Sequence, residues 1–253
     1  MALHVISCCT YLTEVGGRPW RRHDHDAHDF VKAVKGQTIS GWALVPCRGA
    51  LVRIDDSKRD VALTLFARMI SDRAQELGLS GPAVVVPVPN SRCHVGCERP
   101  PRTFEQAAAL ASEVGLTLIV ADVLRWAEAL PSASLGGGLR EADYLFDRLR
   151  LVQELPSVGL PYLLLDDVMT SGGHLRACAA MLREYGCRVD LAVVAGRACR
   201  TQMAQPFEVR VEVLEDFVPG ESETGVSTWH YFREDRWAPA HPSVGDAVSK
   251  MSP

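Results

Sequence analysis

The residues best suited to chemistry lie together in residues 162–174. An apolar stretch, Tyr162–Leu165, runs into two carboxylates, Asp166 and Asp167, and then into a Thr-Ser-Gly-Gly turn. Glycine-rich turns before a helix offer backbone N–H groups to an anion, and hydroxyls donate to phosphate oxygens. Carboxylates repel phosphate, so they suit sugar hydroxyls or Mg²⁺. The pattern predicts a site for a phosphorylated sugar with metal-bound pyrophosphate; a tight strand-to-helix turn with a capping Asp is the alternative.

This segment resembles the phosphoribosyl pyrophosphate (PRPP) motif of type I phosphoribosyltransferases, which reads hydrophobics, Asp-Asp, two variable residues, two Thr or Ser, Gly, Gly or Ala, and Thr. The resemblance implies that Asp166 and Asp167 are the catalytic residues. They would bind the ribose hydroxyls and hold Mg²⁺, mostly through PRPP. The family's closing Thr is a histidine here, which loses the hydroxyl but keeps the backbone N–H. The residues implied for the 5′-phosphate are Thr170, Ser171, Gly172, Gly173 and His174.

A second stretch is similar to the ComF-like, amidophosphoribosyltransferase-like branch of that family. Residues 84–89 read Val-Val-Val-Pro-Val-Pro, and residues 102–107 read Arg-Thr-Phe-Glu-Gln-Ala. In that branch a Val-Pro-Val-Pro strand leads through a basic loop to an Arg-Gly-Phe-Asn-Gln helix start; Thr103 and Glu105 replace its Gly and Asn. For any single arginine a solvated loop is the alternative. The residues implied for pyrophosphate are Asn90, Ser91, Arg92, Arg99 and Arg102.

Residues 126–143 are predicted to form a flexible excursion, because they contain Pro131, two serines and the run Gly136–Gly138. ComF-like chains carry a mobile loop between comparable anchors. The resemblance therefore implies a lid that closes over PRPP, with Arg125 and Arg140 as its flexible-loop residues.

Two further clusters have residue types that bind metals. Residues 23–29 alternate His and Asp, with pairs four apart that would align on a helix. Cys93, His94 and Cys97 supply three donors within five residues, one fewer than a structural zinc site needs. A solvated charged segment and an ordinary loop are the alternatives, and the sequence leaves them open.

These motifs need a scaffold, and the hydrophobic pattern supplies one. Buried strands alternate with amphipathic helices, which is the βαβ rhythm of a parallel sheet covered on both faces. Such sheets bind ligands beyond the carboxyl ends of their strands. The predicted strands cover residues 83–88, 116–121, 161–165 and 189–195, with strand-like segments at 4–11, 38–45 and 208–214; the predicted helices cover residues 57–77, 103–114 and 173–185.

We therefore expect an α/β fold with a type I phosphoribosyltransferase-like central parallel sheet, helices on both faces and a variable hood. Residues 1–50 would be an N-terminal extension and candidate hood. Residues 51–200 would be the core, and residues 201–253 a C-terminal extension that is either hood or partly disordered tail. Aromatic residues that could stack on a base in the hood are Trp42, Trp229, His230 and Tyr231.

Composition limits the alternatives. The 253 residues carry a net charge of −4, so no global basic field favours nucleic acid or anionic membrane. No apolar run approaches the roughly 18–20 residues of a membrane span. No signal-peptide pattern is visible and the eight cysteines form no CxxC pair, so we expect reduced thiols and a cytoplasmic protein. Arginine makes up 23 of 27 cationic residues, a bias that coding preference explains apart from the arginines assigned above.

The functional hypothesis is a phosphoribosyltransferase that uses PRPP and Mg²⁺ to ribosylate a base or other nitrogen nucleophile and releases pyrophosphate. The alternative is a non-catalytic protein on the same fold that senses PRPP or a nucleotide, or that assists DNA uptake. DNA is a partner only in this alternative, a membrane in neither, and a homodimer stays open.

Overall fold

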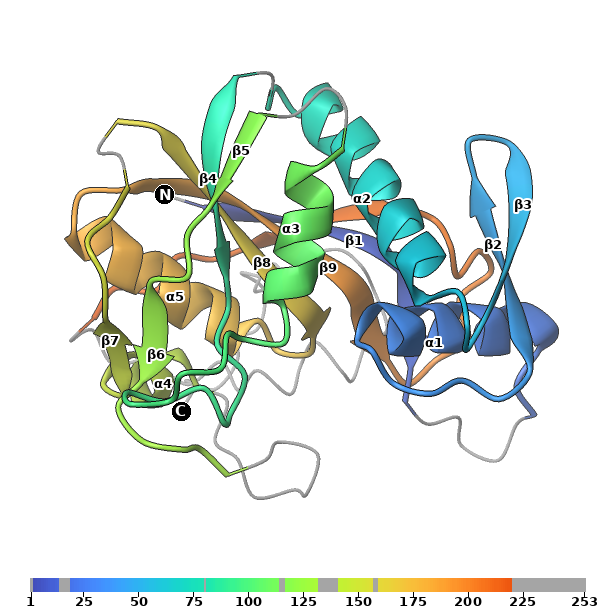
Figure 1. Cartoon of the computed structure of the whole chain (residues 1–253), viewed down its shortest axis with the longest axis horizontal. Helices are drawn as coiled ribbons and strands as arrows, with labels where there is room; N and C mark the ends of the chain where they lie inside the picture. Colours follow the sequence, from blue (N-terminus) through green and yellow to red (C-terminus); the bar gives the residue numbers. More distant parts are fainter. Residues whose placement is uncertain are drawn as a thin grey trace, which may run out of the picture.

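The computed structural model describes residues 2–13, 19–79, 81–113, 117–131, 141–156 and 159–219. Six strands form the main sheet in the order β10-β1-β9-β8-β4-β5, and all neighbours are parallel except β10 and β1 (Figure 1). The strands of this sheet are β1 (Leu3–Leu12), β4 (Pro82–Pro87), β5 (Thr117–Val120), β8 (Pro161–Met169), β9 (Arg188–Cys199) and β10 (Arg210–Leu214). The predicted fold class is confirmed.

The helices and two small antiparallel ladders complete the described fold. Strand β2 (Trp42–Cys47) pairs with β3 (Ala50–Asp55), and β6 (Leu124–Trp126) pairs with β7 (Leu149–Leu151). The helices are α1 (Arg22–Val34), α2 (Arg59–Glu76), α3 (Phe104–Ala111), α4 (Ala142–Phe146) and α5 (Gly173–Glu184).

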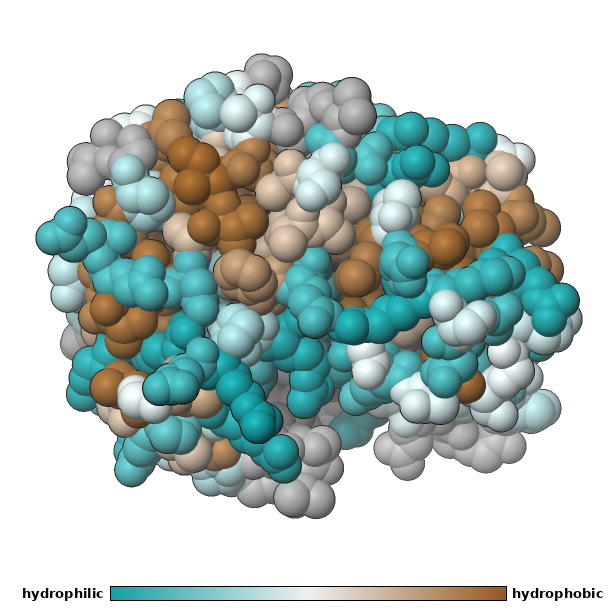
Figure 2. Space-filling model, in the orientation of Figure 1, coloured by the Kyte–Doolittle hydropathy of each residue, from teal (hydrophilic) through white to brown (hydrophobic). Residues whose placement is uncertain are grey.

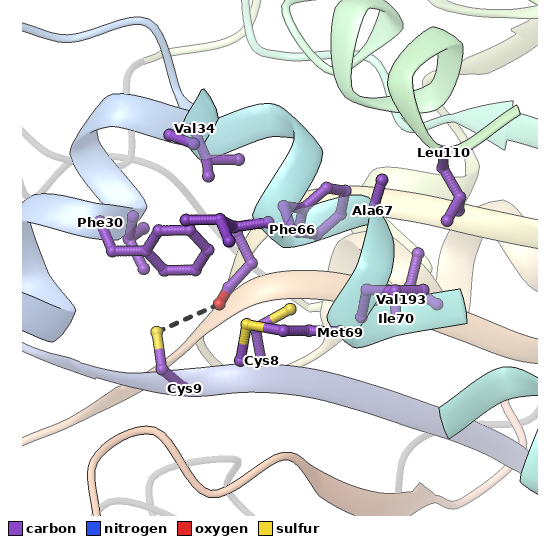
Figure 3. Packing of buried hydrophobic residues seen from close by; sticks show 14 of the residues in the cluster. Cys8, Cys9, Phe30, Val34, Phe66, Ala67, Met69, Ile70, Leu110 and Val193 are labelled. Carbon is purple, nitrogen blue, oxygen red and sulfur yellow. Dashed lines mark hydrogen bonds between the residues drawn. The ribbon is translucent and has the colours of Figure 1, made fainter. Parts of the chain in front are cut away.

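Each face of the sheet packs into its own hydrophobic core. On β4, Val85 points into the core shared with α1, α2 and α3, whereas Val84 and Val86 point into the core shared with α4 and α5. This alternation is what a strand covered on both sides requires, and it explains why the predicted strands are almost continuously apolar. Figure 3 shows Phe30 of α1 and Phe66 of α2 meeting in the first core, above the sheet.

The sheet takes one strand from each of the two expected extensions. Strand β1 lies between β9 and β10, so it belongs to the sheet interior although it falls within residues 1–50. Strand β10 pairs antiparallel with β1 from beyond residue 200, as the edge strand predicted at 208–214. The central sheet therefore extends beyond the predicted core of residues 51–200. The hood role of the two extensions stays a prediction.

The polar stretch at residues 23–29 is helical, as part of α1. Two of its carboxylates are buried and have structural partners. Asp24 accepts hydrogen bonds from the backbone N–H and the guanidinium of Arg21 at the helix start. Asp26 accepts the backbone N–H of Leu44 at 3.0 Å and pairs with Arg22 at 2.9 Å. Asp24 therefore caps the start of α1 and Asp26 joins α1 to β2, two roles that the alternation of His and Asp did not reveal.

The predicted excursion at residues 126–143 needs a correction at both ends. Trp126 is fully buried in β6 and Ala142 is fully buried in α4, so neither belongs to a solvated loop. Arg125 is buried too and forms a two-point ion pair with Asp122. Residues 132–140, including Arg140, lie outside the described residues, so the lid stays a prediction.

Most of the cysteines are buried. All eight cysteines are free thiols, and five of them lie in the two main hydrophobic cores. No helix among the described residues is long and apolar enough to cross a membrane. Figure 2 shows hydrophilic side chains across the middle of one face, with apolar patches on either side of them.

Candidate functional site

The two adjacent carboxylates stand at the end of β8 and point in different directions. Successive residues on a strand face opposite sides of the sheet. Asp167 turns toward α1, where its Oδ2 lies 3.3 Å from Nζ of Lys35. Asp166 shares a hollow with residues 168–175 on the side of α5. The sequence motif therefore becomes a pair of carboxylates that straddle the strand end, only one of which has a lysine partner.

This arrangement raises the pKa of Asp166. Burial and the charge of Asp167 raise the pKa of Asp166 to about 8, opposed by the backbone N–H of Asp167, which donates to Asp166 Oδ1 at 2.8 Å, and by Lys35. Lys35 stabilises the charge on Asp167 directly. In the free protein the protonated form of Asp166 is thus favoured, beside an Asp167 that is ion-paired with Lys35.

The turn after β8, which we call the anion loop (residues 170–173), leaves its donors available. Gly172 has φ of 81°, a conformation that side chains other than glycine rarely adopt. No side chain caps the N-terminus of α5. Within the described chain, the backbone N–H groups of Ser171 and Gly172 donate to no backbone carbonyl. Ser171 Oγ is buried without a partner among the described residues, so the loop offers unused donors at a helix N-terminus.

His174, the residue that departs from the family motif, packs against Trp126. The two rings lie 5.5 Å apart between centroids. The indole N–H of Trp126 in turn donates to the carbonyls of Pro89 at 3.0 Å and Asn90 at 3.1 Å. Trp126 therefore joins the start of α5 to the segment that follows β4, and it holds the two candidate binding segments in register.

That second segment, which we call the basic loop (residues 90–102), begins beside the carboxylates, because Val88 N–H donates to Leu165 O at 2.8 Å. Its far end is fixed by the Thr103 hydroxyl, which donates to Val88 O at 2.9 Å. Between these anchors Arg92, Arg99 and Arg102 are exposed, and none has a side-chain hydrogen bond or ion pair to a described residue. Asn90 and Ser91, the other two predicted residues, are half-buried, and Asn90 Oδ1 accepts the N–H of Arg92 at 3.1 Å.

The structure thus brings some predicted residues together and not others. Asp166 and the residues of the anion loop share one hollow, and the basic loop starts next to them. Arg125 is committed to Asp122. Trp42 lies between Arg22 and Arg53, each stacked on its ring. The remaining base-stacking candidates, Trp229, His230 and Tyr231, lie outside the described residues.

Neither candidate metal cluster gathers its donors. Within the described ranges, no three His, Cys, Asp or Glu side chains are placed to hold a metal ion. His28 instead stacks on Tyr11 at 4.8 Å between ring centroids. The thiols of Cys93 and Cys97 both contact the carbonyl of Arg99.

Lys35 and Trp126 are site residues that sequence reasoning missed. Lys35 sits at the C-terminal end of α1, about 130 residues before its partner Asp167 in the chain. Trp126 was assigned to a flexible excursion. A hint was available for the lysine, because it is one of four in a chain with 23 arginines, but nothing in the sequence connected it to the carboxylates.

One curated protein is similar to part of this chain. Over 92 residues the chain is 34% identical to a curated adenine phosphoribosyltransferase from Sphingopyxis alaskensis, an alignment that covers 36% of this chain. The chain spans about half, 48%, of that relative's length. No family model matches the chain. The partial similarity supports the type I phosphoribosyltransferase family; the ComF-like branch stays a prediction.

Proposed function

We propose that this protein is a phosphoribosyltransferase that takes PRPP as the ribosyl donor and a nitrogen nucleophile as the acceptor. One observation carries the proposal. The paired carboxylates at the end of β8 run directly into a loop in which the N–H groups of Ser171 and Gly172 and the Ser171 hydroxyl have no partner among the described residues. A ligand that carries both vicinal hydroxyls and a phosphate monoester meets all of these groups at once.

The 5′-phosphate would bind in the anion loop. Backbone N–H groups at a helix N-terminus attract an anion through their own dipoles and that of the helix. The buried hydroxyl of Ser171 adds a donor that is already desolvated, so it loses no further hydration when phosphate arrives. His174 contributes its backbone N–H, while its ring stays on Trp126.

The ribose hydroxyls would bind the carboxylates. Asp167, charged beside Lys35, can accept from a hydroxyl directly. Asp166 must release a proton before it accepts in the same way, because its pKa is raised in the free protein. Ligand binding is therefore linked to proton release at this residue.

Mg²⁺ fits these residues as a substrate-bound ion. The described chain offers two carboxylates at the site and no third ligand. Mg²⁺ is typically held by one or two carboxylates together with substrate phosphates and water. Asp166 and Asp167 would hold it, and when bound it would neutralise the leaving pyrophosphate.

The reaction breaks the bond between C1 of the ribose and a pyrophosphate oxygen, and forms a bond from the nucleophile's nitrogen to C1. Pyrophosphate leaves with the electron pair of the broken bond, and the nucleophile releases one proton to solvent. Positive charge develops on the ribose ring, so the carboxylates beneath it stabilise the transition state electrostatically. The arginines of the basic loop would hold the departing charge, and the fixed phosphate and ribose would orient C1.

A sensing protein on the same fold is the second candidate. The observation that favours it is His174, whose ring packs on Trp126 where the family has a hydroxyl for the phosphate. In that case the site binds PRPP or a nucleotide without transferring the ribosyl group. An accessory role in DNA uptake has no supporting contact among the described residues.

The test is a pyrophosphate-release assay with PRPP, Mg²⁺ and a panel of purine and pyrimidine bases and amines. We expect release that depends on one class of nucleophile. Binding of PRPP without stimulated release would favour sensing. If neither PRPP nor any nucleoside monophosphate binds, the site assignment is wrong.

A further inference from the structure

Behind the anion loop lies a buried ion pair that neither candidate binding segment contains. Arg197 of β9 and Glu212 of β10 are 8% and 5% exposed. The guanidinium meets the carboxylate at two points, Nε to Oε2 at 2.8 Å and Nη2 to Oε1 at 3.2 Å. Strand β1 separates β9 from β10 in the sheet, so this pair spans a neighbouring strand. Burying two charges costs desolvation free energy, so a buried ion pair often adds little to stability. This pair therefore needs a reason beyond stability.

The remaining nitrogen of the guanidinium supplies that reason. Arg197 Nη1 donates to the carbonyl oxygen of Thr170, the first residue of the anion loop, at 2.5 Å. A trans peptide points its C=O and the following N–H in opposite directions. With the carbonyl of Thr170 held by Arg197, the N–H of Ser171 must point away from that guanidinium. The arginine therefore fixes the orientation of a peptide whose N–H is one of the loop's unused donors.

Strand β10 supports the loop at a second point. Glu212 and Leu214 are two apart, so they lie on the same face of β10. Leu214 packs so closely behind Gly172 that a Cβ added to the glycine would lie 2.6 Å from Leu214 Cδ1. One residue of β10 thus orients Arg197, and the other fills the space behind the left-handed glycine.

We propose that Arg197, aimed by Glu212, is a positioning residue for phosphate binding, and that β10 is the element that sets the shape of the anion loop. This rests on the proposed function. Because Glu212 neutralises Arg197, the arginine acts by orienting the Thr170–Ser171 peptide rather than by attracting the ligand. The binding site therefore depends on a strand that lies after residue 200, outside the segment that resembles phosphoribosyltransferases.

The test removes the pair without leaving a lone buried charge. The double variant Arg197→Met/Glu212→Leu replaces it with apolar side chains of similar size, a change that buried pairs often tolerate. Its matched control, Glu208→Leu/Arg210→Met, removes the more exposed ion pair at the start of the same strand. Each protein is assayed for binding of ribose 5-phosphate, for KM and kcat with PRPP, and for Tm.

We expect the Kd for ribose 5-phosphate and the KM for PRPP to rise about tenfold or more in the double variant. This is the effect of losing one hydrogen bond to a charged group, here the bond from the Ser171 N–H to the phosphate. The kcat should change less, and the control should bind as the unchanged protein does. A merely structural role would lower the folded fraction, and hence kcat, with KM unchanged. That outcome, or a folded double variant with unchanged Kd, overturns the inference.

Two further results keep the test decisive. If the double variant does not fold, Arg197→Lys is used, which keeps the charge near Glu212 but cannot also reach Thr170 in the same geometry. It should still weaken ribose 5-phosphate binding, and an unchanged Kd would overturn the inference. If the unchanged protein binds neither ribose 5-phosphate nor PRPP nor a nucleoside monophosphate, the proposed function itself is wrong, and this inference is wrong with it.

Discussion

The anion loop and the basic loop follow neighbouring strands, β8 and β4, yet they are built in opposite ways. The anion loop is backed by buried groups, with Arg197 on one carbonyl, Leu214 behind Gly172 and His174 resting on Trp126. The basic loop is fixed at its two ends and along Trp126, and its arginines extend into solvent. One region is shaped before the ligand arrives; the other supplies mobile charge.

This difference matches what each region would hold. A phosphate monoester bound by N–H groups needs donors within a few tenths of an ångström of their places, and buried packing provides that accuracy. Pyrophosphate must be held and then released, so long side chains with weak, solvent-screened contacts suit it. The comparison predicts that changes beside the anion loop have large effects on every phosphorylated ligand. Changes in the basic loop should have small effects on pyrophosphate-bearing ligands alone.

The largest effect is expected at the two carboxylates of β8 that precede the anion loop. Asp166→Asn with Asp167→Asn should weaken PRPP binding by about 100-fold or more, since at least two hydrogen bonds to charged groups are lost. The melting temperature should change little, because a costly buried carboxylate and a single ion pair are removed together. Calorimetric titration and a thermal melt measure the two quantities.

Asp190→Asn is the matched control for binding. Asp190 lies in β9, next to β8, but at the opposite end of the strands from Asp166 and Asp167. If the double variant unfolds, the carboxylates are structural. If it binds PRPP normally, they do not form the ribose site.

A pH dependence should follow from the pKa of Asp166. The free protein holds a proton that ribose binding displaces, so PRPP affinity should rise with pH by up to about tenfold per unit until the pKa is passed. Binding measured from pH 6 to 9 tests this. The same measurement is made on Asp166→Asn. The phosphates of the ligand titrate equally in both experiments, so any difference between the pH profiles of the unchanged protein and the variant comes from Asp166. Parallel profiles would contradict the prediction.

The same group sets a sign for stability. The pKa of Asp166 is higher in the folded state than its unfolded value of about 3.9. The contribution of Asp166 to the free energy of unfolding is therefore fully present below about pH 3.9. That contribution is lost as pH rises through the folded-state pKa of about 8. Asp166→Asn should therefore raise Tm more at pH 8 than at pH 5, and an equal shift at both would mean that the carboxylate is not buried.

Ser171→Ala should weaken ribose 5-phosphate binding by about tenfold, the lower end for a hydrogen bond to a charged group. The folded protein should be equally or slightly more stable, because the hydroxyl is buried without a partner. Ser7→Ala in β1 removes another buried, unpartnered hydroxyl and is the control. Equal binding by both variants would show that the hydroxyl of Ser171 does not face the ligand.

The smallest effects are expected in the basic loop. Changing Arg92, Arg99 or Arg102 singly to Gln should weaken PRPP binding about threefold, within the range of exposed ion pairs, and less at high salt. Binding of a nucleoside monophosphate should not change. Arg48→Gln, which removes an exposed arginine paired with Asp72, is the control. A large loss for either ligand would remove the distinction between the two loops.

Much of the candidate site could be predicted from the sequence because its residues are close together in the chain. The carboxylates, the loop hydroxyls and the glycines are consecutive, and a buried strand before them with a helix after them forces them to one end of the sheet. The same holds for the basic loop after β4. The metal interpretation of residues 23–29 found no support in the described residues, because burial of Asp24 and Asp26 depends on what the helix packs against.

The sequence by itself determined the sheet of alternating strands and helices, and the end of that sheet where the candidate binding residues gather, since each follows from short-range pattern. Only the tertiary structure decided which distant groups complete the site. Lys35 reaches Asp167, Trp126 joins the two loops, and Arg197 with Glu212 holds Thr170. These contacts join residues 15 to 132 positions apart, and no local rule of propensity or periodicity specifies such pairs. The contact of Arg197 with Glu212, for example, exists only because β1 and β10 extend the sheet beyond β9.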